Sequence, residues 1–216
     1  MKFPNAFAGV KKIFSAEILS LICSVCTTVM LAMPVIGLIA VANKSSGGAA
    51  ASLGGFAVLA IAAMVLSIIA FIFKLLGIIT ASKDEQSFKI SMYLILAAIV
   101  ASIVSGIFNS NSTVTSIMAI VSDILNLGIT VFIIQGIKNL AEKLGDEKMV
   151  KKGNTLYKYI VAIYALIIIA QIISMILQNG TGLIIVLVII VISGILNLIQ
   201  YILYLIYLSK AKKMLA

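Results

Sequence analysis

The sequence predicts an all-α integral membrane protein: a six-transmembrane-helix bundle built from three tandem helical hairpins, with both chain ends in the cytoplasm. Three observations predict this fold. Of the 216 residues, 62% are hydrophobic and 11% are charged, long apolar stretches occur six times, and lysine-rich connections alternate with lysine-poor ones. Because a soluble domain usually carries about 25% charged residues, this chain has too little polar surface for a soluble fold. We expect residues 1–216 to form a single transmembrane domain.

Each predicted helix is an apolar stretch long enough to cross a bilayer, which takes about 20 residues. The six stretches cover residues 13–42, 53–81, 88–109, 114–144, 156–178 and 183–208. Two helices joined by a short connection run out and back, so consecutive stretches form hairpins. The three hairpins span roughly residues 11–83, 88–152 and 156–213.

The placement of lysine predicts the orientation of these helices. Of the 16 lysines, 15 lie near the chain ends or near the connections that follow the second and fourth stretches. The connections that follow the first, third and fifth stretches contain only Lys44. Short loops rich in lysine stay in the cytoplasm, so we expect both termini inside. Lys74 lies within the second stretch near its cytoplasmic end, where we expect its long stem to reach the lipid headgroups.

The net charge of +9 is expected to act at the inner membrane surface. Each lysine there gains about 1 kcal/mol against anionic lipid headgroups. Nucleic-acid binding requires a contiguous basic face, which no part of the sequence offers, so we exclude it. All basic residues are lysine and isoleucine is abundant, a composition typical of an AT-rich bacterial genome. We therefore expect a multi-pass protein of a bacterial cell membrane.

The hairpins are related by an internal sequence repeat. Residues 101–109 align with residues 170–178, and residues 122–127 align with residues 193–198 through shared Ser, Ile, Leu and Asn. Residues 23–30 fit the first of these patterns more loosely. Self-similarity of this kind is the sequence signature of a repeated structural unit. The unit here is one helical hairpin.

Polar residues of several helices are predicted to share one layer in the outer half of the bilayer. Thr27, Ser105 and Ser174 each follow a lysine by 16 residues, which is about 24 Å along a helix. Such side chains either hold helices together, at about 0.6 kcal/mol per hydrogen bond, or line a pocket for a polar solute. The layer comprises Ser24, Thr27, Ser102, Ser105, Asp123, Asn126, Gln171, Ser174 and Asn197.

Asp123 is the one acidic residue predicted deep in the membrane. It lies about 22 Å from Lys138 along its helix, and no basic residue is within reach at that depth. An intramembrane carboxyl group is costly and is a functional candidate by default. Its counterpart in the repeat is Gly194, so the feature is not symmetric. We expect a hydrogen bond to Asn126, Ser174 or Asn197, and both a functional and a structural role stay open.

The residue types present exclude most catalytic chemistry. Histidine is absent, which removes the commonest acid–base catalyst and metal ligand. Cys23 and Cys26 fall on one helix face, but zinc requires four ligands, and a disulfide relay would need a second cysteine pair. We expect these cysteines to pack as small residues. We expect no enzyme activity, no metal and no cofactor.

The connection from Lys138 to Lys158 is predicted to be helical, with Gly145 and Gly153 as the positions where it can break. It either lies on the headgroups or docks a cytoplasmic protein through Lys138, Lys143, Lys148, Lys151 and Lys152. Two function classes follow. The first is a non-catalytic accessory subunit, scaffold or immunity-type protein, and the alternative is a small-solute or ion transporter that uses Asp123 and the polar layer.

Overall fold

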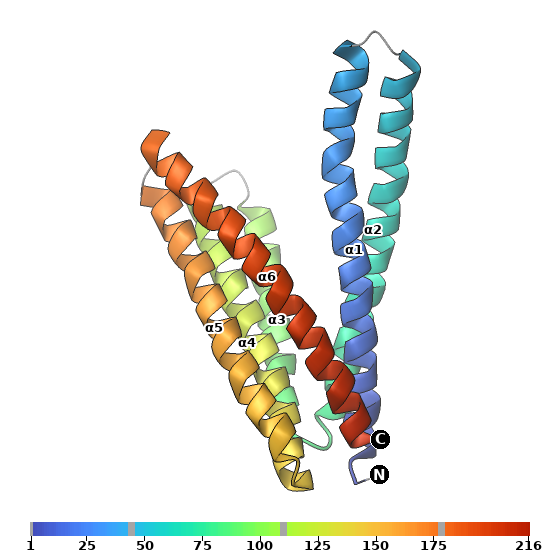
Figure 1. Cartoon of the computed structure of the whole chain (residues 1–216), viewed down its shortest axis with the longest axis vertical. Helices are drawn as coiled ribbons and strands as arrows, with labels where there is room; N and C mark the ends of the chain where they lie inside the picture. Colours follow the sequence, from blue (N-terminus) through green and yellow to red (C-terminus); the bar gives the residue numbers. More distant parts are fainter. Residues whose placement is uncertain (1, 43–45, 109–111, 177–179) are drawn as a thin grey trace. The chain divides into compact units, whose positions relative to one another are not determined.

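The computed structural model describes residues 2–42, 46–108, 112–176 and 180–216, with side chains for residues 2–27, 57–108, 113–169, 171–173, 196 and 198–216. Within this part of the chain all secondary structure is helical, as predicted (Figure 1). The helices are α1 (Pro4–Ala42), α2 (Ser46–Ala81), α3 (Gln86–Ile107), α4 (Ser112–Leu144), α5 (Glu147–Ile176) and α6 (Gly180–Leu215).

Four helical segments among the described residues are long and apolar enough to cross a membrane, which supports the multi-pass prediction. These segments are Ala57–Ala81, Gln86–Ile107, Thr113–Leu144 and Glu147–Ile173. Six spans, the repeat and the orientation stay predictions.

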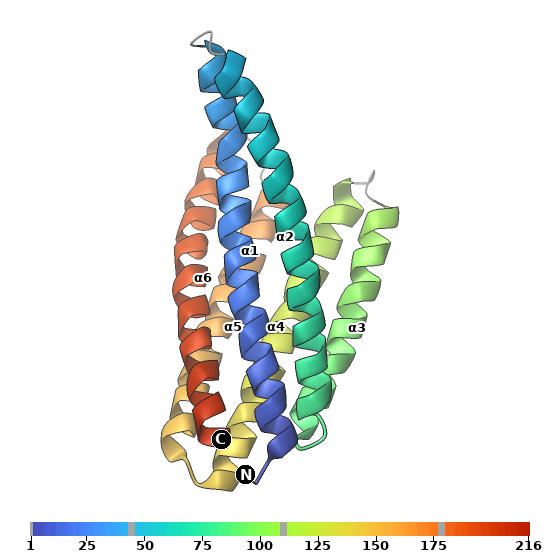
Figure 2. The same cartoon turned by 90° about the vertical axis from the view of Figure 1, so that its right-hand side faces the viewer.

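Contacts divide the chain into two compact units, of which the smaller comprises Lys11–Gly77. In this unit α1 and α2 run side by side as a hairpin (Figures 1 and 2). The Cys23 thiol donates a hydrogen bond to the Ala63 carbonyl at 3.4 Å, and both cysteines are free thiols. This close contact between helices agrees with the structural role expected for Cys23.

An ion pair inside the hairpin corrects the prediction for Lys74. Its Nζ lies 2.8 Å from Oε1 of Glu17, whose side chain is almost fully buried. We expected Lys74 to extend to the lipid headgroups, but it contacts an acid on the neighbouring helix instead. The physical reason is that an unpaired charge is strongly disfavoured in an apolar environment, whereas two opposite charges in contact offset much of that penalty.

The larger unit comprises Met1–Val10 and Ile78–Ala216. Its helices pack in chain order, α3 against α4, α4 against α5 and α5 against α6. Its most completely buried large side chains lie toward the end where α4 meets α5, and include Phe88, Ile133, Ile137, Leu140, Ile160 and Leu208. Farther along α3, large apolar side chains such as Val100, Ile103 and Ile107 are exposed, as expected for a surface that faces lipid.

Glycine and a capping aspartate determine where α4 ends and α5 begins. Gly145 has a φ of 74°, a conformation that glycine adopts without steric penalty and that commonly ends helices. Asp146 Oδ1 then accepts the Met149 backbone N–H at 3.0 Å, which is an N-cap interaction. The predicted break at Gly145 is confirmed. Gly153 does not break the chain but lies buried inside α5.

A glycine allows close packing between α3 and α4. A Cβ added at Gly136 would lie 2.7 Å from Cε2 and 2.9 Å from Cζ of Phe88, a fully buried side chain. We predict that Gly136→Ala destabilises the protein by about 1–3 kcal/mol, because the ring has no room to move away. Thermal unfolding in detergent measures this effect.

Gly106→Ala is the matched control for this prediction. Gly106 lies in α3, and an added Cβ there would have no neighbour within 4 Å. Alanine is a better helix former than glycine, so this variant should unfold at the wild-type temperature or slightly above it. Equal unfolding temperatures for the two variants would contradict the close contact at Gly136.

Candidate functional site

Two members of the predicted polar layer meet between α4 and α5. The Gln171 side-chain amide donates a hydrogen bond to Oδ2 of Asp123 at 2.6 Å. Both side chains are half-buried. The oxygen of the same Gln171 amide, Oε1, is buried and has no hydrogen-bond partner among the described residues. Asp123 is therefore held by a neighbouring helix, with one buried acceptor beside it still unoccupied.

The partner of Asp123 differs from the three that we expected. Asn126 is exposed, and the side chains of Ser174 and Asn197 lie outside the described residues. Gln171 belongs to the predicted layer, and a comparison of depths would have found it. It lies 13 residues beyond Lys158, about 20 Å along α5, which is close to the depth of Asp123.

The hydroxyl groups of the predicted layer that the structure describes lie on α1, in the smaller unit, and on α3, in the larger one. Ser102 and Thr27 are exposed, and each donates to a carbonyl of its own helix, four residues back, at 2.9 Å. Ser24 is exposed and Ser105 is half-buried. Within the larger unit the structure thus brings Asp123 and Gln171 together, whereas Ser102 bonds along its own helix.

A polar network that the sequence analysis missed joins the α2–α3 turn to α4. Glu85 precedes α3, is 8% exposed and accepts a hydrogen bond from the Asn139 side-chain amide at 2.9 Å. Lys143 Nζ lies 2.6 Å from its other carboxylate oxygen. The sequence indicates only that acidic residues and lysines occur in neighbouring connections. It does not show that Glu85 pairs with Asn139 and Lys143.

The adjacent acid, Asp84, anchors the beginning of α1. Its carboxylate accepts the backbone N–H of Ala6 at 2.7 Å and the Asn5 side-chain amide at 2.9 Å. A carboxylate at a helix N-terminus satisfies free backbone donors and interacts favourably with the helix dipole. The two acids of this turn therefore hold the first turn of α1 and the last turns of α4 in one polar cluster.

The surroundings of Glu85 lower the pKa of its carboxyl group from the ordinary value of 4.5. Burial acts in the opposite direction, because it disfavours the charged form. The hydrogen bonds from Asn139 and Lys143 and the positive charge of Lys143 together outweigh burial. Ionised Glu85 is consequently the form that stabilises this end of the molecule.

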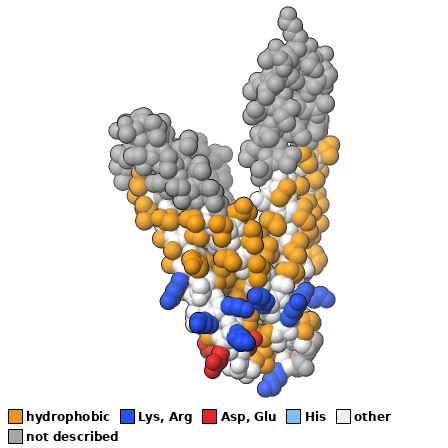
Figure 3. All heavy atoms as spheres, in the orientation of Figure 1, with side chains coloured by type: hydrophobic (Ala, Val, Ile, Leu, Met, Phe, Trp, Pro, Cys, Tyr) orange, Lys and Arg blue, Asp and Glu red, His pale blue; other side chains and the backbone are white. Residues whose placement is uncertain are grey.

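Two of the five lysines predicted to dock a partner are engaged within the chain. Lys143 pairs with Glu85, and Lys138 donates to Oδ1 of Asn154 at 3.2 Å. These two charges thus fasten α4 to its neighbours, and docking of a partner through the five lysines stays a prediction. Lys148, Lys151 and Lys152 in the first turns of α5 are exposed. In Figure 3 the lysine and acidic side chains of the larger unit gather near the end where α4 meets α5.

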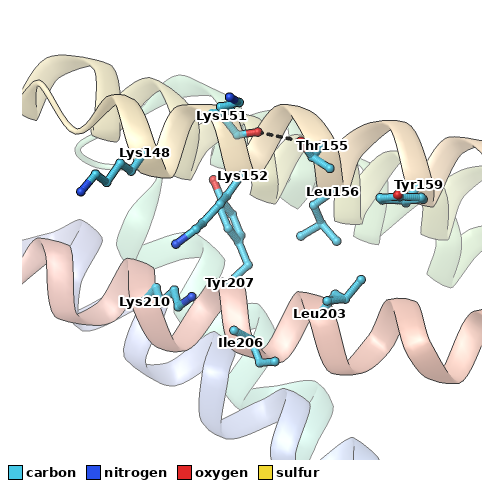
Figure 4. Close-up of a pocket in the computed structure, with 10 residues that line it drawn as sticks. All are labelled: Lys148, Lys151, Lys152, Thr155, Leu156, Tyr159, Leu203, Ile206, Tyr207 and Lys210. Carbon is cyan, nitrogen blue, oxygen red and sulfur yellow. Dashed lines mark hydrogen bonds between the residues drawn. The ribbon is translucent and has the colours of Figure 1, made fainter.

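Two recesses adjoin these three exposed lysines. One, of about 600 Å³, lies at the α4–α5 turn and is lined by Glu142, Gly145, Glu147, Lys148, Val150, Lys151 and Asn154. The other, of about 520 Å³, is a cleft between α5 and α6 (Figure 4).

Among the residues that the structure describes, no group of three or more Cys, Asp and Glu side chains is placed to hold a metal ion. No family model, curated protein or solved structure matches this chain.

The Asp123–Gln171 hydrogen bond gives a prediction that separates shape from charge. Asp123→Asn keeps an acceptor for the Gln171 amide and should unfold within about 0.5 kcal/mol of the wild type. Asp123→Leu leaves the Gln171 amide without an acceptor and should lower the free energy of unfolding by about 1–3 kcal/mol. Thermal unfolding in detergent distinguishes the two variants.

Asn126→Leu is the matched control, since Asn126 is exposed on the same helix one turn away. It should leave stability close to that of the wild type. If Asp123→Leu is as stable as Asn126→Leu, the interhelical hydrogen bond does not stabilise the protein.

The lowered pKa of Glu85 predicts an acid-sensitive contribution to stability. A carboxyl group whose folded-state pKa lies below its unfolded value stabilises the fold above the unfolded value, and this contribution is lost as pH falls through the folded pKa. Wild-type stability should therefore decline as pH falls below about 4.5. Glu85→Gln should be less stable at neutral pH, and the difference from wild type should shrink in acid.

Glu142→Gln serves as the control, because Glu142 is exposed near the end of α4 and the variant keeps Glu85. It should retain the acid-dependent decline of the wild type. A constant difference between Glu85→Gln and wild type from neutral pH to pH 3 would show that the charge of Glu85 is not what stabilises the cluster.

Proposed function

We propose that the protein is a non-catalytic, multi-pass membrane protein that acts through its helices and its α4–α5 turn on a membrane or cytoplasmic protein partner. Its role would be that of an accessory subunit, a scaffold or an immunity-type protein. The proposal includes six spans arranged as three repeated hairpins. It also includes cytoplasmic termini and location in a bacterial plasma membrane, both argued from the lysine distribution and composition.

The recess at the α4–α5 turn is the observation that carries the proposal. Gly145 and the Asp146 cap define the backbone of this turn, and the recess of about 600 Å³ beside it carries charges of both signs from Glu142, Glu147, Lys148 and Lys151. Mixed charges around a hollow favour recognition of a polar protein segment, since complementary charges determine which partner binds.

Contacts that hold the α4–α5 end of the molecule in place also support docking of a partner at the recess. Asn154 lies against α4 through its hydrogen bond with Lys138, and Lys143 is held by Glu85. The exposed lysines thus project from an end of the chain that is fastened at several points. Binding to a surface that is already ordered loses less conformational entropy.

Charge reversal at the recess tests the proposal in native membranes. A photo-crosslinker at Lys151 should yield one discrete protein product of the full chain, and Lys148→Glu should reduce its yield at least about fivefold by removing a complementary charge. The measurement is the yield of the crosslinked band after affinity purification of the chain.

Lys83→Glu is the matched control, because Lys83 is an exposed lysine of the α2–α3 turn outside the recess. It should keep the wild-type yield. A yield that falls equally with both variants, or an equal product from a crosslinker at Lys89, would contradict docking at the recess.

The alternative function is a small-solute or ion transporter that uses the polar layer and Asp123. It is favoured by the buried Oε1 of Gln171, which has no partner among the described residues and could accept a hydrogen bond from a solute beside Asp123. Under this alternative, transport by reconstituted protein would stop in Asp123→Asn while the fold persists, since an amide cannot ionise. The direct interhelical bond of Asp123 makes the first function the better supported one.

A further inference from the structure

The cleft between α5 and α6 has two chemically different ends. Figure 4 shows Lys148, Lys152 and Lys210 at one end, and Leu156 and Leu203 toward the other. The cleft encloses about 520 Å³, which is within the range of pockets that bind small molecules. The cleft therefore offers a cationic end and an apolar end side by side.

The cationic end lacks a neutralising partner within the cleft. None of the ten described residues that line it is acidic. Lys152 lies beside Lys210 across the cleft, and this proximity lowers the pKa of Lys210. Two adjacent ammonium groups favour an anion between them. The first turn of α5, which contributes Lys148, adds the positive end of a helix dipole.

A buried hydroxyl group provides a second, independent indication of a polar ligand. Tyr207 lines the cleft and is only 3% exposed. Its hydroxyl has no hydrogen-bond partner among the described residues, and it packs against Gly153 of α5, the residue that follows Lys152. A buried hydroxyl is normally hydrogen-bonded, so this group is an unsatisfied donor in a side chain that lines the cleft.

The apolar end continues along helix surfaces that are partly open. Leu203 and Ile206 line the cleft from α6, and their side chains are 41% and 45% exposed. Leu156 lines it from α5 and is buried, with 5% of its surface exposed. α5 belongs to a segment apolar enough to span a membrane. The cationic end lies at the start of that segment, so the apolar end extends toward the hydrocarbon.

We propose that this cleft binds one anionic phospholipid, with its phosphate among Lys148, Lys152 and Lys210 and an acyl chain along Leu156, Leu203 and Ile206. A free phosphate would use the cationic end alone, and an uncharged lipid would use the apolar end alone. Basic pockets between transmembrane helices are known to select acidic headgroups. The inference requires that α5 span the bilayer, and it does not depend on the docking partner proposed above.

Native mass spectrometry of the full chain in detergent tests this inference with phosphatidylglycerol and phosphatidylcholine as probes. The wild type should retain one phosphatidylglycerol and release phosphatidylcholine. Lys152→Gln/Lys210→Gln should lower the apparent affinity for phosphatidylglycerol about tenfold or more, because each lysine attracts an anionic headgroup. Equal retention of the two lipids by wild type would overturn the proposal.

A matched pair of substitutions controls for net charge. Lys83→Gln/Lys213→Gln removes the same charge from two exposed lysines outside the cleft, and it should keep the wild-type affinity. If the two double variants lose affinity equally, binding depends on overall charge and the site is wrong. Should Lys152→Gln/Lys210→Gln fail to fold, Lys210→Gln alone, at a surface position, should still lower the affinity about threefold or more.

Two further arms identify the ligand. Leu203→Trp should fill the apolar end and lower phosphatidylglycerol affinity without changing the net charge, and unchanged affinity would overturn the placement of the acyl chain. Inorganic phosphate at about 10 mM, a hundredfold above a dissociation constant of about 0.1 mM, should leave the bound lipid in place. Complete displacement by phosphate, or by an acidic peptide at the same concentration, would show that the cleft recognises a soluble anion or a protein instead.

Discussion

The structure depends most on the separation of lysine from the apolar surface of the helices. Large hydrophobic side chains such as Val58, Val100 and Ile107 are more than half exposed, and water would not tolerate so much exposed apolar area on a stable monomer. A bilayer accommodates this surface, but it excludes the lysine ammonium groups. Helices that are apolar along their length must therefore carry their charged residues at their ends. In the larger unit, charged side chains lie near the α4–α5 turn (Figure 3).

The same constraint explains two pairs of polar side chains that join neighbouring helices. Glu17 contacts Lys74 within the α1–α2 hairpin, and Asp123 accepts a hydrogen bond from Gln171 between α4 and α5. Leaving one partner alone in an apolar environment costs far more than the pair contributes to stability. These pairs thus specify which helices lie together, and Glu85 with Lys143 does the same at the polar end. The interaction surfaces that we propose are built from the lysines left over, at the recess and at the α5–α6 cleft.

Helix positions could be predicted from the sequence because they depend on local properties. Apolar length placed each predicted stretch within or close to one helix, and the conformational freedom of Gly145 placed the α4–α5 turn. α5 begins at Glu147, nine residues before the predicted apolar stretch, and these nine residues lie in the connection that is predicted to be helical. The Asp146 cap and the contact of α5 with α6 stabilise these polar first turns of the helix.

The partners of individual polar residues could not be predicted in the same way. Lys74 and Glu17 are 57 residues apart, and Lys143 and Glu85 are 58 apart, so each pairing depends on how whole helices pack. Gly153 shows the same limit of local rules. A Cβ there would lie 2.7 Å from the Tyr207 hydroxyl of α6. This glycine therefore lets α6 pack closely against α5, whereas Gly145 ends a helix. Asp123 was recognised as unusual from its depth, but its contact with Gln171 required the arrangement of α4 and α5.

Labelling of single cysteines in intact cells tests most directly the claim that the lysine-bearing connections share one side of the membrane. In a Cys23→Ser/Cys26→Ser background, a cysteine at Ser112 should react with an impermeant maleimide added outside, and a cysteine at Lys148 should react only after the membrane is permeabilised. The opposite pattern, or equal labelling of both positions from outside, would contradict the separation of charge on which the account of this protein is built.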